Sequence, residues 1–450
     1  MLKKLLAFLL LCNISIVGVS ANPIETTINC TIHGQKQVGP GPAAGIELYQ
    51  LKNGALNRVE WKRFDENGHC SFNVDVKKEG IYFIQKVSKL PDVKYVLYLK
   101  AGEQKTLDLY LQPTSSDYDS VKIDKPNAET KILQAWLNGF KNYSKIVHGK
   151  KQAETYKLYE EFVTFSSSFL KSNKTTNSYF NAWLADKVDT DLKYLRAANF
   201  FRFNKRFLAG YDSSRVVQAF YQPLENKKII NDPRLLRSEH GMDFLRYVLA
   251  YWKFNQVKNV EDLTAYNLQA SIYSEDFPKI TNNNIKVSYI IHKMNGETAI
   301  KKYEEFRKYV QPYQDLFNTA EWKAVYQKMY DELYLFAKGT PGYNFELKDG
   351  NEKTYTLASF KGKVVIVDVW AMWCAPCLEE KPVMEKIAEG YKDRNDIVFV
   401  GISCDGFGKK EPWKAFVKRH GYTSIELLSD PGGSVKAYYK MDGIPPFPGF

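Results

Sequence analysis

Apolar and polar residues alternate along residues 24–112. Positions two apart are apolar in several short runs, which are Ile28, Cys30 and Ile32; Cys70, Phe72, Val74 and Val76; and parts of Tyr95–Leu99 and Leu107–Leu111. Asn53-Gly54 and Asn67-Gly68 lie between such runs and are typical turn signals. Short strands separated by turns predict an all-β domain, a sandwich or a small barrel, which we bound at residues 22–122 and treat as sandwich-like.

Between residues 123 and 338 the apolar pattern changes to the period of a helix. Leu133, Trp136, Leu137 and Phe140 form one apolar set, and Leu158, Phe162, Phe165 and Phe169 form another. Both spacings place apolar side chains on one helix face, which is typical of core packing. We predict an α-helical middle domain, whose sequence contains no cysteine and assigns it no function.

After the connector Gly339-Thr340-Pro341-Gly342, strand and helix patterns alternate to residue 450. The predicted elements are a hairpin of Phe345–Leu347 and Thr354–Leu357 around Asp349-Gly350, buried strands at Val364–Val369 and Ile397–Ser403, and helices at Leu378–Tyr391 and Trp413–His420. Strands that alternate with helices predict an α/β domain over residues 339–450.

Composition agrees with a multidomain globular chain. Its 450 residues suggest about three domains at roughly 100–200 residues each. Hydrophobic residues at 44% and charged residues at 25% exclude a disordered, collagen-like or small disulfide-stapled chain. The net charge of +12 permits an anionic partner. Because the basic residues are scattered and no zinc-finger or RNA-binding signature is present, we expect no nucleic-acid partner.

The first 21 residues are typical of an export signal. Its parts are the basic Lys3 and Lys4, the apolar run that begins at Leu5–Leu11, and the small residues Val19-Ser20-Ala21. We expect cleavage before Asn22 and export to the periplasm or cell envelope, with no transmembrane segment left afterwards. A membrane anchor is one alternative, but the apolar run is short for a span. A lipoprotein attached through Cys12 is another, although a small residue does not precede that cysteine.

The clearest chemical motif is Trp373-Cys374-Ala375-Pro376-Cys377, between a predicted strand and a predicted helix. Zinc needs four ligands, and the later Cys404 and His420 form no second pair. A c-type haem needs a histidine where Leu378 stands. The remaining interpretation is a redox dithiol, and we expect no metal and no cofactor.

The expected geometry suits thiol–disulfide exchange. Cys374 would begin the helix, where backbone N–H groups and the helix dipole favour a thiolate. That thiolate would attack a substrate disulfide. Cys377, one turn further and closer to the core, would then attack Cys374 and release the substrate as a dithiol.

These residues resemble a known family. The segment Val364–Cys377 is similar to a thioredoxin-fold active-site segment. Phe360-Lys361-Gly362-Lys363 and Ile402-Ser403-Cys404-Asp405 resemble the TlpA/ResA-type branch of exported thiol–disulfide oxidoreductases. The resemblance covers roughly residues 343–445. It implies a thioredoxin-like C-terminal domain, protein thiol and disulfide substrates, an upstream redox donor, and a pathway such as cytochrome c-type biogenesis. The β and helical regions resemble, more weakly, modules that precede such domains in bacterial envelope proteins.

The resemblance also implies roles for single residues. Asp368 matches a buried acid that relays the proton of Cys377, and a strand-end turn residue is the alternative. Trp370 and Trp373 match the aromatic residues beside the dithiol, of which Trp373 would contact substrate, and a packing role is the alternative for both. Ile444-Pro445 matches the cis-proline loop, which faces the dithiol and pairs with the substrate backbone.

The C-terminus departs from the family pattern. In the family, a further strand follows the cis-proline and pairs with the strand that corresponds to Val364–Val369. Here Pro446-Phe447-Pro448-Gly449-Phe450 follows instead. We expect either a truncated or frame-shifted product, or another element that covers the open edge. We favour truncation, since long unpaired edges promote aggregation.

The other cysteines leave two interpretations open. Cys30 and Cys70 lie on the apolar side of their strands, which predicts a possible structural disulfide or two free core thiols. Cys404 is expected to be a packed thiol, and a third redox partner is the alternative.

The whole pattern predicts an exported thiol–disulfide oxidoreductase. Reduction is the expected direction, because Ala375-Pro376 lacks the histidine found between the cysteines of strongly oxidising relatives. An envelope binding protein with a vestigial or truncated thioredoxin module is the alternative.

Overall fold

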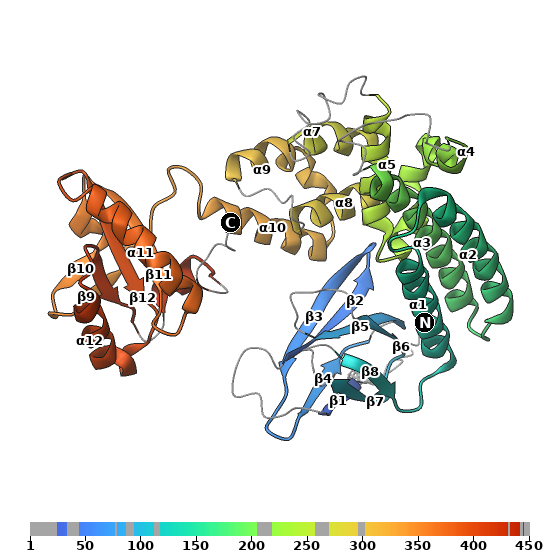
Figure 1. Cartoon of the computed structure of the whole chain (residues 1–450), viewed down its shortest axis with the longest axis horizontal. Helices are drawn as coiled ribbons and strands as arrows, with labels where there is room; N and C mark the ends of the chain where they lie inside the picture. The colour runs from blue at the N-terminus through green and yellow to red at the C-terminus, as the bar shows by residue number, and fades with distance from the viewer. Residues whose placement is uncertain are drawn as a thin grey trace, which may run out of the picture. The chain divides into compact units, whose positions relative to one another are not determined.

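The computed structural model describes residues 25–33, 45–76, 79–86, 94–111, 118–204, 218–256, 270–295, 302–430, 433–441 and 444. The chain divides into two compact units, Met1–Asn295 and Gly296–Phe450 (Figure 1). This division differs from the predicted boundaries, because the β region and most of the helices share the first unit. The predicted signal sequence, with Cys12, lies outside the described residues.

Two four-stranded sheets form the β region of the first unit, with strand orders β4-β1-β7-β8 and β3-β2-β5-β6 (Figure 1). The strands are β1 (Thr26–His33), β2 (Gly45–Lys52), β3 (Ala55–Arg63), β4 (His69–Val74), β5 (Gly80–Lys86), β6 (Lys94–Leu99), β7 (Gln104–Leu111) and β8 (Tyr118–Ile123). One hydrophobic cluster takes residues from both sheets. Ile28, Cys30 and Ile32, which alternate with polar residues in the sequence, are all buried in this cluster.

Strands β5 and β6 are apolar on both faces. Tyr82, Ile84, Leu97 and Leu99 belong to the cluster between the sheets, whereas Ile81, Phe83, Val96 and Tyr98 belong to a cluster shared with the helices. Successive side chains on a strand point to opposite faces. A strand that is covered on both faces therefore shows a continuous apolar run, which explains why alternation is incomplete here.

The helices of the first unit follow the β region in the chain, and the first three share a hydrophobic cluster with the outer face of this sheet. They are α1 (Ala128–Ile146), α2 (Gln152–Ser172), α3 (Ser178–Asn204), α4 (Gln218–Tyr221), α5 (Gly241–Phe254), α7 (Ala270–Lys279) and α8 (Asn283–Asn295), with short 3-10 helices at Gln222–Glu225, Lys227–Asn231 and Pro233–Arg237. The predicted stripe of Leu133, Trp136, Leu137 and Phe140 is buried against β5 and β6. Phe165 departs from its predicted stripe, because its side chain is 43% exposed.

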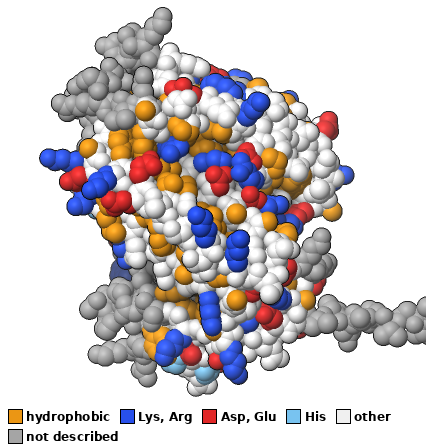
Figure 2. All heavy atoms as spheres, turned by 90° about the vertical axis from the view of Figure 1, so that its right-hand side faces the viewer, with side chains coloured by type: hydrophobic (Ala, Val, Ile, Leu, Met, Phe, Trp, Pro, Cys, Tyr) orange, Lys and Arg blue, Asp and Glu red, His pale blue; other side chains and the backbone are white. Residues whose placement is uncertain are grey.

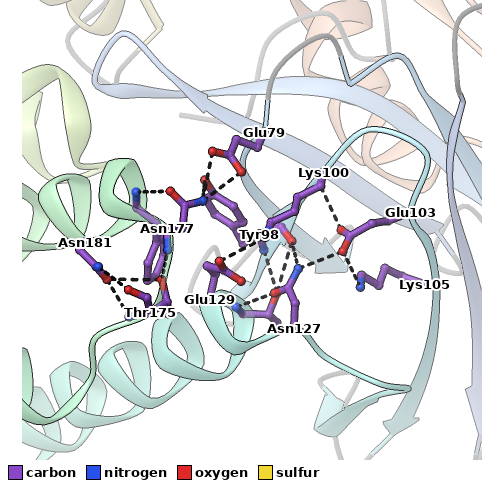
Figure 3. Close-up of polar contacts among 12 residues, drawn as sticks. Glu79, Tyr98, Lys100, Glu103, Lys105, Asn127, Glu129, Thr175, Asn177 and Asn181 are labelled. Carbon is purple, nitrogen blue, oxygen red and sulfur yellow. Dashed lines mark hydrogen bonds and ion pairs between the residues drawn. The ribbon is translucent and has the colours of Figure 1, made fainter.

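Asparagine side chains connect the β region to the helices (Figure 3). Asn127 caps α1 by accepting from the Thr130 N–H at 2.9 Å, and its Nδ2 donates to the Tyr98 carbonyl at 2.9 Å. Asn177 Nδ2 donates to both carboxylate oxygens of Glu79, at 3.0 and 3.1 Å. Each asparagine therefore hydrogen-bonds to a group of the β region from the start of a helix. These contacts agree with the placement of the β region and the helices in one compact unit.

The second unit begins with α9 (Tyr303–Tyr309), a 3-10 helix at Gln311–Leu316 and α10 (Ala320–Tyr334). The α/β domain follows, with β9 (Glu346–Asp349), β10 (Thr354–Thr356), β11 (Val364–Trp370), α11 (Ala375–Gly390), β12 (Ile397–Ser403), α12 (Lys410–His420), β13 (Ile425–Leu428) and α13 (Ser434–Tyr438), and 3-10 helices at Leu357–Phe360 and Phe407–Lys409. The predicted hairpin is present as antiparallel β9 and β10. Helix α11 begins three residues before its predicted start, so it includes Cys377.

Strand β11 is an edge strand in this structure. The sheet order is β10-β9-β13-β12-β11, and β11 pairs in parallel with β12. Val364 and Val367 of β11 are 59% and 41% exposed. The open apolar edge that the sequence predicts is therefore present among the described residues.

Charge is mixed on the face drawn in Figure 2, where Lys and Arg side chains are interspersed with Asp, Glu and hydrophobic ones. Some basic residues of the first unit are paired with acids, as Lys193 is with Asp189 at 2.7 Å. None of the helices in the described ranges combines the length and apolar character that a membrane crossing requires.

Candidate active site

The predicted dithiol lies at the junction of β11 and α11. Cys374 is the N-cap residue of α11, and its N–H donates to the Ala371 carbonyl at 3.1 Å. The preceding turn is held by Asp405, whose Oδ2 accepts from the Met372 N–H at 2.8 Å. Pro376 lies in the first turn of α11, where a missing N–H leaves no helical hydrogen bond unmade. The motif is therefore positioned by the end of β11 and the start of α11, as the sequence predicts.

Cys374 and Cys377 are joined by a disulfide, with a Cα–Cα distance of 5.3 Å. The Cys377 N–H points at Cys374 Sγ, 3.3 Å away. An N–H donor and the positive end of the helix dipole both stabilise negative charge on that sulfur once the disulfide opens. The site can therefore hold Cys374 as a thiolate.

Both cysteines of the dithiol are buried. Cys374 is 3% exposed and Cys377 is 5% exposed, so the prediction that Cys377 lies closer to the core is not supported by exposure. The carbonyl oxygen of Ile444 is 3.4 Å from Cys374 Sγ. Trp373 is 67% exposed beside the dithiol. Ile444 is thus brought to the site as predicted, whereas Pro445 lies outside the described residues.

Asp368 is less buried than the acid that the resemblance implies. Its side chain is 27% exposed, and its Oδ2 lies 3.1 Å from Nζ of Lys381. Asp368 is therefore half-buried and paired with a cation.

Lys381 is buried at the centre of a charged group that sequence reasoning missed. Its Nζ lies 2.7 Å from Glu426 Oε1 and 4.0 Å from Glu385 Oε1. It also lies 4.9 Å from the ring centroids of Trp370 and Tyr422. A buried ammonium needs such partners, since an unpaired one would carry a large desolvation cost.

Glu426 enters this group from β13, between Ile425 and Leu427. Its Oε2 accepts from Trp370 Nε1 at 2.8 Å. A Cβ atom at Gly401 would lie 2.3 Å from the same oxygen, so glycine leaves the space that the carboxyl occupies. Burial raises the pKa of the Glu426 carboxyl, although Lys381 opposes this effect.

A small cavity reaches these charged groups from one side of α11. Its lining residues are Ile366, Asp368, Lys381, Met384, Glu385, Ala388, Phe399, Val400, Gly401 and Ser424. The signals that could have found the group were a charged residue inside the apolar strand Ile425–Leu428, and a lysine one turn after Cys377.

Cys404 packs against the apolar cluster that contains Cys374, Cys377 and Trp370. Its N–H donates to the Trp370 carbonyl at 2.7 Å, and burial raises the pKa of its thiol. Its thiol is free, as are those of Cys30 and Cys70. A packed thiol is thus the role that its surroundings favour.

One further group in the described residues has the donors for a metal ion. Single ligand atoms of Asp191, Glu239 and His240 lie within 4.8 Å of one another. However, Nζ of Lys187 lies 2.9 Å from Asp191 Oδ2 and 2.7 Å from Glu239 Oε2. The ammonium group already supplies the positive charge that these carboxylates require.

Comparison with known proteins shows what the C-terminal domain is similar to. Residues 339–445 match the AhpC/TSA family. The chain is 29% identical over 126 residues to the thiol-disulfide oxidoreductase ResA of Oceanobacillus iheyensis, a match that covers 27% of this chain and 64% of the relative. It is 31% identical over 108 residues to the thioredoxin-like protein YneN of Bacillus subtilis, covering 24% of this chain and 62% of that protein. The chain thus spans less than two thirds of the length of either relative.

Among solved structures, the chain is similar to the thioredoxin domain of a thiol-disulfide oxidoreductase from Bacteroides vulgatus. The identity is 26%, and the match covers 24% of this chain and 76% of that one, with a TM-score of 0.22. The family match at residues 339–445 includes the dithiol.

Proposed function

Because residues 339–445 form a thioredoxin-fold domain of the AhpC/TSA family with ResA-type homologues, we propose that the protein is an exported thiol–disulfide oxidoreductase. Cys374 is the attacking residue and Cys377 the resolving residue. The observation that supports this most is the position of Cys374 as N-cap of α11, with the Cys377 N–H 3.3 Å from its sulfur. Protein disulfides are the proposed substrates, and a dithiol donor upstream regenerates the enzyme.

The proposed cycle begins with reduced protein. The Cys374 thiolate attacks one sulfur of a substrate disulfide, and the other substrate sulfur leaves as a thiol after taking a proton. Cys377 loses its proton and attacks Cys374 Sγ in the mixed disulfide. The second substrate sulfur leaves as a thiol, and the Cys374–Cys377 disulfide forms. Two electrons have then passed from the protein to the substrate.

Asp368 is the proposed acceptor of the Cys377 proton, and Lys381 is a positioning residue. The ammonium of Lys381 lies 3.1 Å from Asp368 Oδ2 and holds that carboxylate in place. The same ammonium holds Glu426 at 2.7 Å. The cavity beside these residues, which Asp368 helps to line, provides space for proton transfer towards solvent.

Substrate contact is proposed at Trp373 and at Ile444-Pro445. Trp373 presents an exposed indole beside the dithiol. The Ile444 carbonyl, 3.4 Å from Cys374 Sγ, is close enough for a substrate backbone N–H to reach it alongside the attacked sulfur. Because Cys374 is only 3% exposed, binding must open this contact before the sulfurs meet.

An insulin-reduction assay on the full chain tests the proposed activity. We expect thiol-dependent turnover by the wild type and background turnover by Cys374→Ser. Cys70→Ser, which alters a thiol in the other unit, is the matched control and should keep full turnover. Turnover by Cys374→Ser, or none by a folded wild type, would reject the proposal.

Two further measurements test direction and location. Equilibration with glutathione buffers gives the reduction potential of the Cys374/Cys377 pair, which we expect near the reducing end of the ~−120 to −270 mV range of thioredoxin-like proteins. A potential near −120 mV would assign oxidation instead. Fractionation of the producing cells should recover the chain outside the cytoplasm, cleaved before Asn22.

A further inference from the structure

Cys30 and Cys70 lie directly opposite each other in the β region of the first unit. They are partners in the register of antiparallel strands β1 and β4. Both thiols are free in this structure. Cys30 is 1% exposed and belongs to the cluster between the sheets, against which Cys70 packs. The two side chains therefore share one face of the sheet.

The Cα separation expected for the two residues falls in the range that disulfides span. The Ile32 N–H donates to the Gly68 carbonyl at 2.8 Å, which identifies this pair as hydrogen-bonded in the antiparallel ladder. Pairs alternate along such a ladder, so Cys30 and Cys70, two residues further on each strand, form a pair of the same kind. Such pairs have Cα atoms about 5.5 Å apart. Disulfides span roughly 4.4–6.8 Å between Cα atoms, but their Cβ atoms lie about 3.5–4.5 Å apart. Cβ atoms of directly opposite residues are about 4.5–5.5 Å apart and are closer in non-hydrogen-bonded pairs, so closing this bond requires the edge strand β4 to shift locally towards β1.

The register that aligns the cysteines is fixed by the turn before β4. Gly68 has a φ of 80°, a left-handed conformation that favours glycine. Asp65 Oδ1 accepts from the His69 N–H at 2.8 Å, and the Asp65 carbonyl accepts from the Gly68 N–H at 3.0 Å. A slip by one residue would turn Cys70 to the outer face. The facing thiols are thus a product of a specified register.

The two thiols differ in their access to solvent. Strand β4 is the edge of the sheet order β4-β1-β7-β8, and Cys70 is half-buried there. Cys30 lies between Cys70 on one side and Leu107 of β7 on the other. The hydrogen bond with Cys70 and burial raise the pKa of the Cys30 thiol far above its ordinary range. Cys70 is therefore the thiol that an external disulfide can reach first.

We propose that Cys30 and Cys70 are a second redox pair, which closes into a cross-strand disulfide by exchange with a low-molecular-weight disulfide. The Cys70 thiolate attacks one sulfur of glutathione disulfide, and one glutathione leaves as a thiol. Cys30 then loses its proton, attacks Cys70 Sγ and releases the second glutathione. The chain loses two protons and two electrons in all, and one glutathione disulfide is reduced to two thiols.

This pair is independent of the proposed oxidoreductase activity, and its test uses the full chain with Cys374→Ser and Cys377→Ser to remove the other dithiol. The chain is equilibrated in glutathione buffers of rising disulfide content, quenched in acid, alkylated and digested. We expect a peptide that joins Cys30 to Cys70 to replace the two alkylated peptides. Cys404 is the internal control and should stay alkylated throughout.

Single substitutions in the same background establish the order of attack. Cys30→Ser should accumulate a glutathione adduct on Cys70, because the resolving thiol is absent. Cys70→Ser should leave Cys30 alkylated and without an adduct. The proposal is overturned if Cys30 and Cys70 stay fully alkylated in disulfide-rich buffer. It is also overturned if the adduct forms on Cys30 in Cys70→Ser and not on Cys70 in Cys30→Ser.

Discussion

The two cysteine pairs of this protein are built in different ways. Cys374 and Cys377 are three residues apart, and one helix start brings them together. Cys30 and Cys70 come from two strands, and only the register of those strands aligns them. The surroundings differ as well. A buried lysine with carboxylate partners lies one helical turn after Cys377, whereas apolar side chains surround Cys30.

This difference teaches which redox pairs a sequence reveals. A CxxC spacing fixes the geometry locally, so the sequence indicates both the pair and the reactive sulfur. A cross-strand pair depends on a register that residues far away in the chain determine. The positions of Cys30 and Cys70 on the apolar side of their strands suggest a pair, but the sequence does not give the distance between the two residues.

Removal of the buried charge of Lys381 in the second unit should have the largest effect on the free energy of unfolding. Lys381→Met leaves Glu426 buried without its cation, and breaking such a pair costs about 3–5 kcal/mol. Urea unfolding of the full chain, followed by tryptophan fluorescence, measures this loss. Lys386→Met, an exposed position on the same helix, is the matched control and should change the free energy of unfolding little.

The double variant Lys381→Met/Glu426→Gln should recover part of the loss, since no buried charge then lacks a partner. The deficit of Lys381→Met should also shrink as the pH falls. Burial raises the folded-state pKa of Glu426, so its protonated form favours folding below the ordinary carboxyl range, and that contribution is lost as the pH rises through the raised value. A deficit that stays constant with pH would contradict the account.

For the β-region pair, the expected effect of oxidation is about 2–4 kcal/mol of added stability, because a disulfide restricts the unfolded chain. Urea unfolding of the Cys374→Ser/Cys377→Ser chain with and without a dithiol reductant measures it. Cys70→Ser in the same background should show no effect of the reductant. Equal stability of the oxidised and reduced chains would show that the register does not accommodate the bond.

The next largest difference that we expect between the two pairs is in the rate of thiol alkylation. Only thiolates are alkylated, and each pKa unit changes the thiolate fraction about tenfold below the pKa. We expect reduced Cys374 to be alkylated at least about a hundredfold faster than Cys30 near pH 7. Timed alkylation with peptide mass spectrometry gives the rates.

The dependence of each alkylation rate on pH reports the pKa of the thiol separately from its accessibility to the reagent. The Cys30 rate should keep rising with pH beyond the ordinary thiol range, because its hydrogen bond with Cys70 and burial raise its pKa. The Cys374 rate should level off at lower pH. Cys404, whose pKa burial raises, should follow Cys30. Parallel profiles for Cys374 and Cys404 would contradict the role of the helix start.

The smallest expected effect belongs to Asp368. General acid–base catalysis typically contributes about 10²–10⁴-fold, but the Asp368 side chain is 27% exposed, so water can also accept the proton. We expect Asp368→Asn to slow resolution of the mixed disulfide by about tenfold, with little change in the attack step. Rapid-quench kinetics separate the steps, and a slower attack with unchanged resolution would exclude the relay.

Much of the fold around the site could be predicted from sequence. The apolar run of β11, the start of α11 at Cys374 and strand β12 depend on local patterns, and the structure has all three.

What the sequence did not reveal depends on distant contacts. Lys381 and Glu426 come from α11 and β13, and their meeting requires the sheet order. The sequence also does not show that the β region and the following helices form one unit. Alternate residues of β5 and β6 pack on the helices, and these apolar residues look the same in the sequence as those that pack between the sheets.

Trapping of the mixed disulfide tests the central claim most directly. The full chain with Cys377→Ser is mixed with a peptide disulfide, quenched in acid and mapped by mass spectrometry. We predict one peptide adduct on Cys374, formed faster than on any other thiol. An adduct that forms first on Cys404 or Cys70, with Cys374 unmodified, would contradict the assignment of Cys374 as the attacking residue.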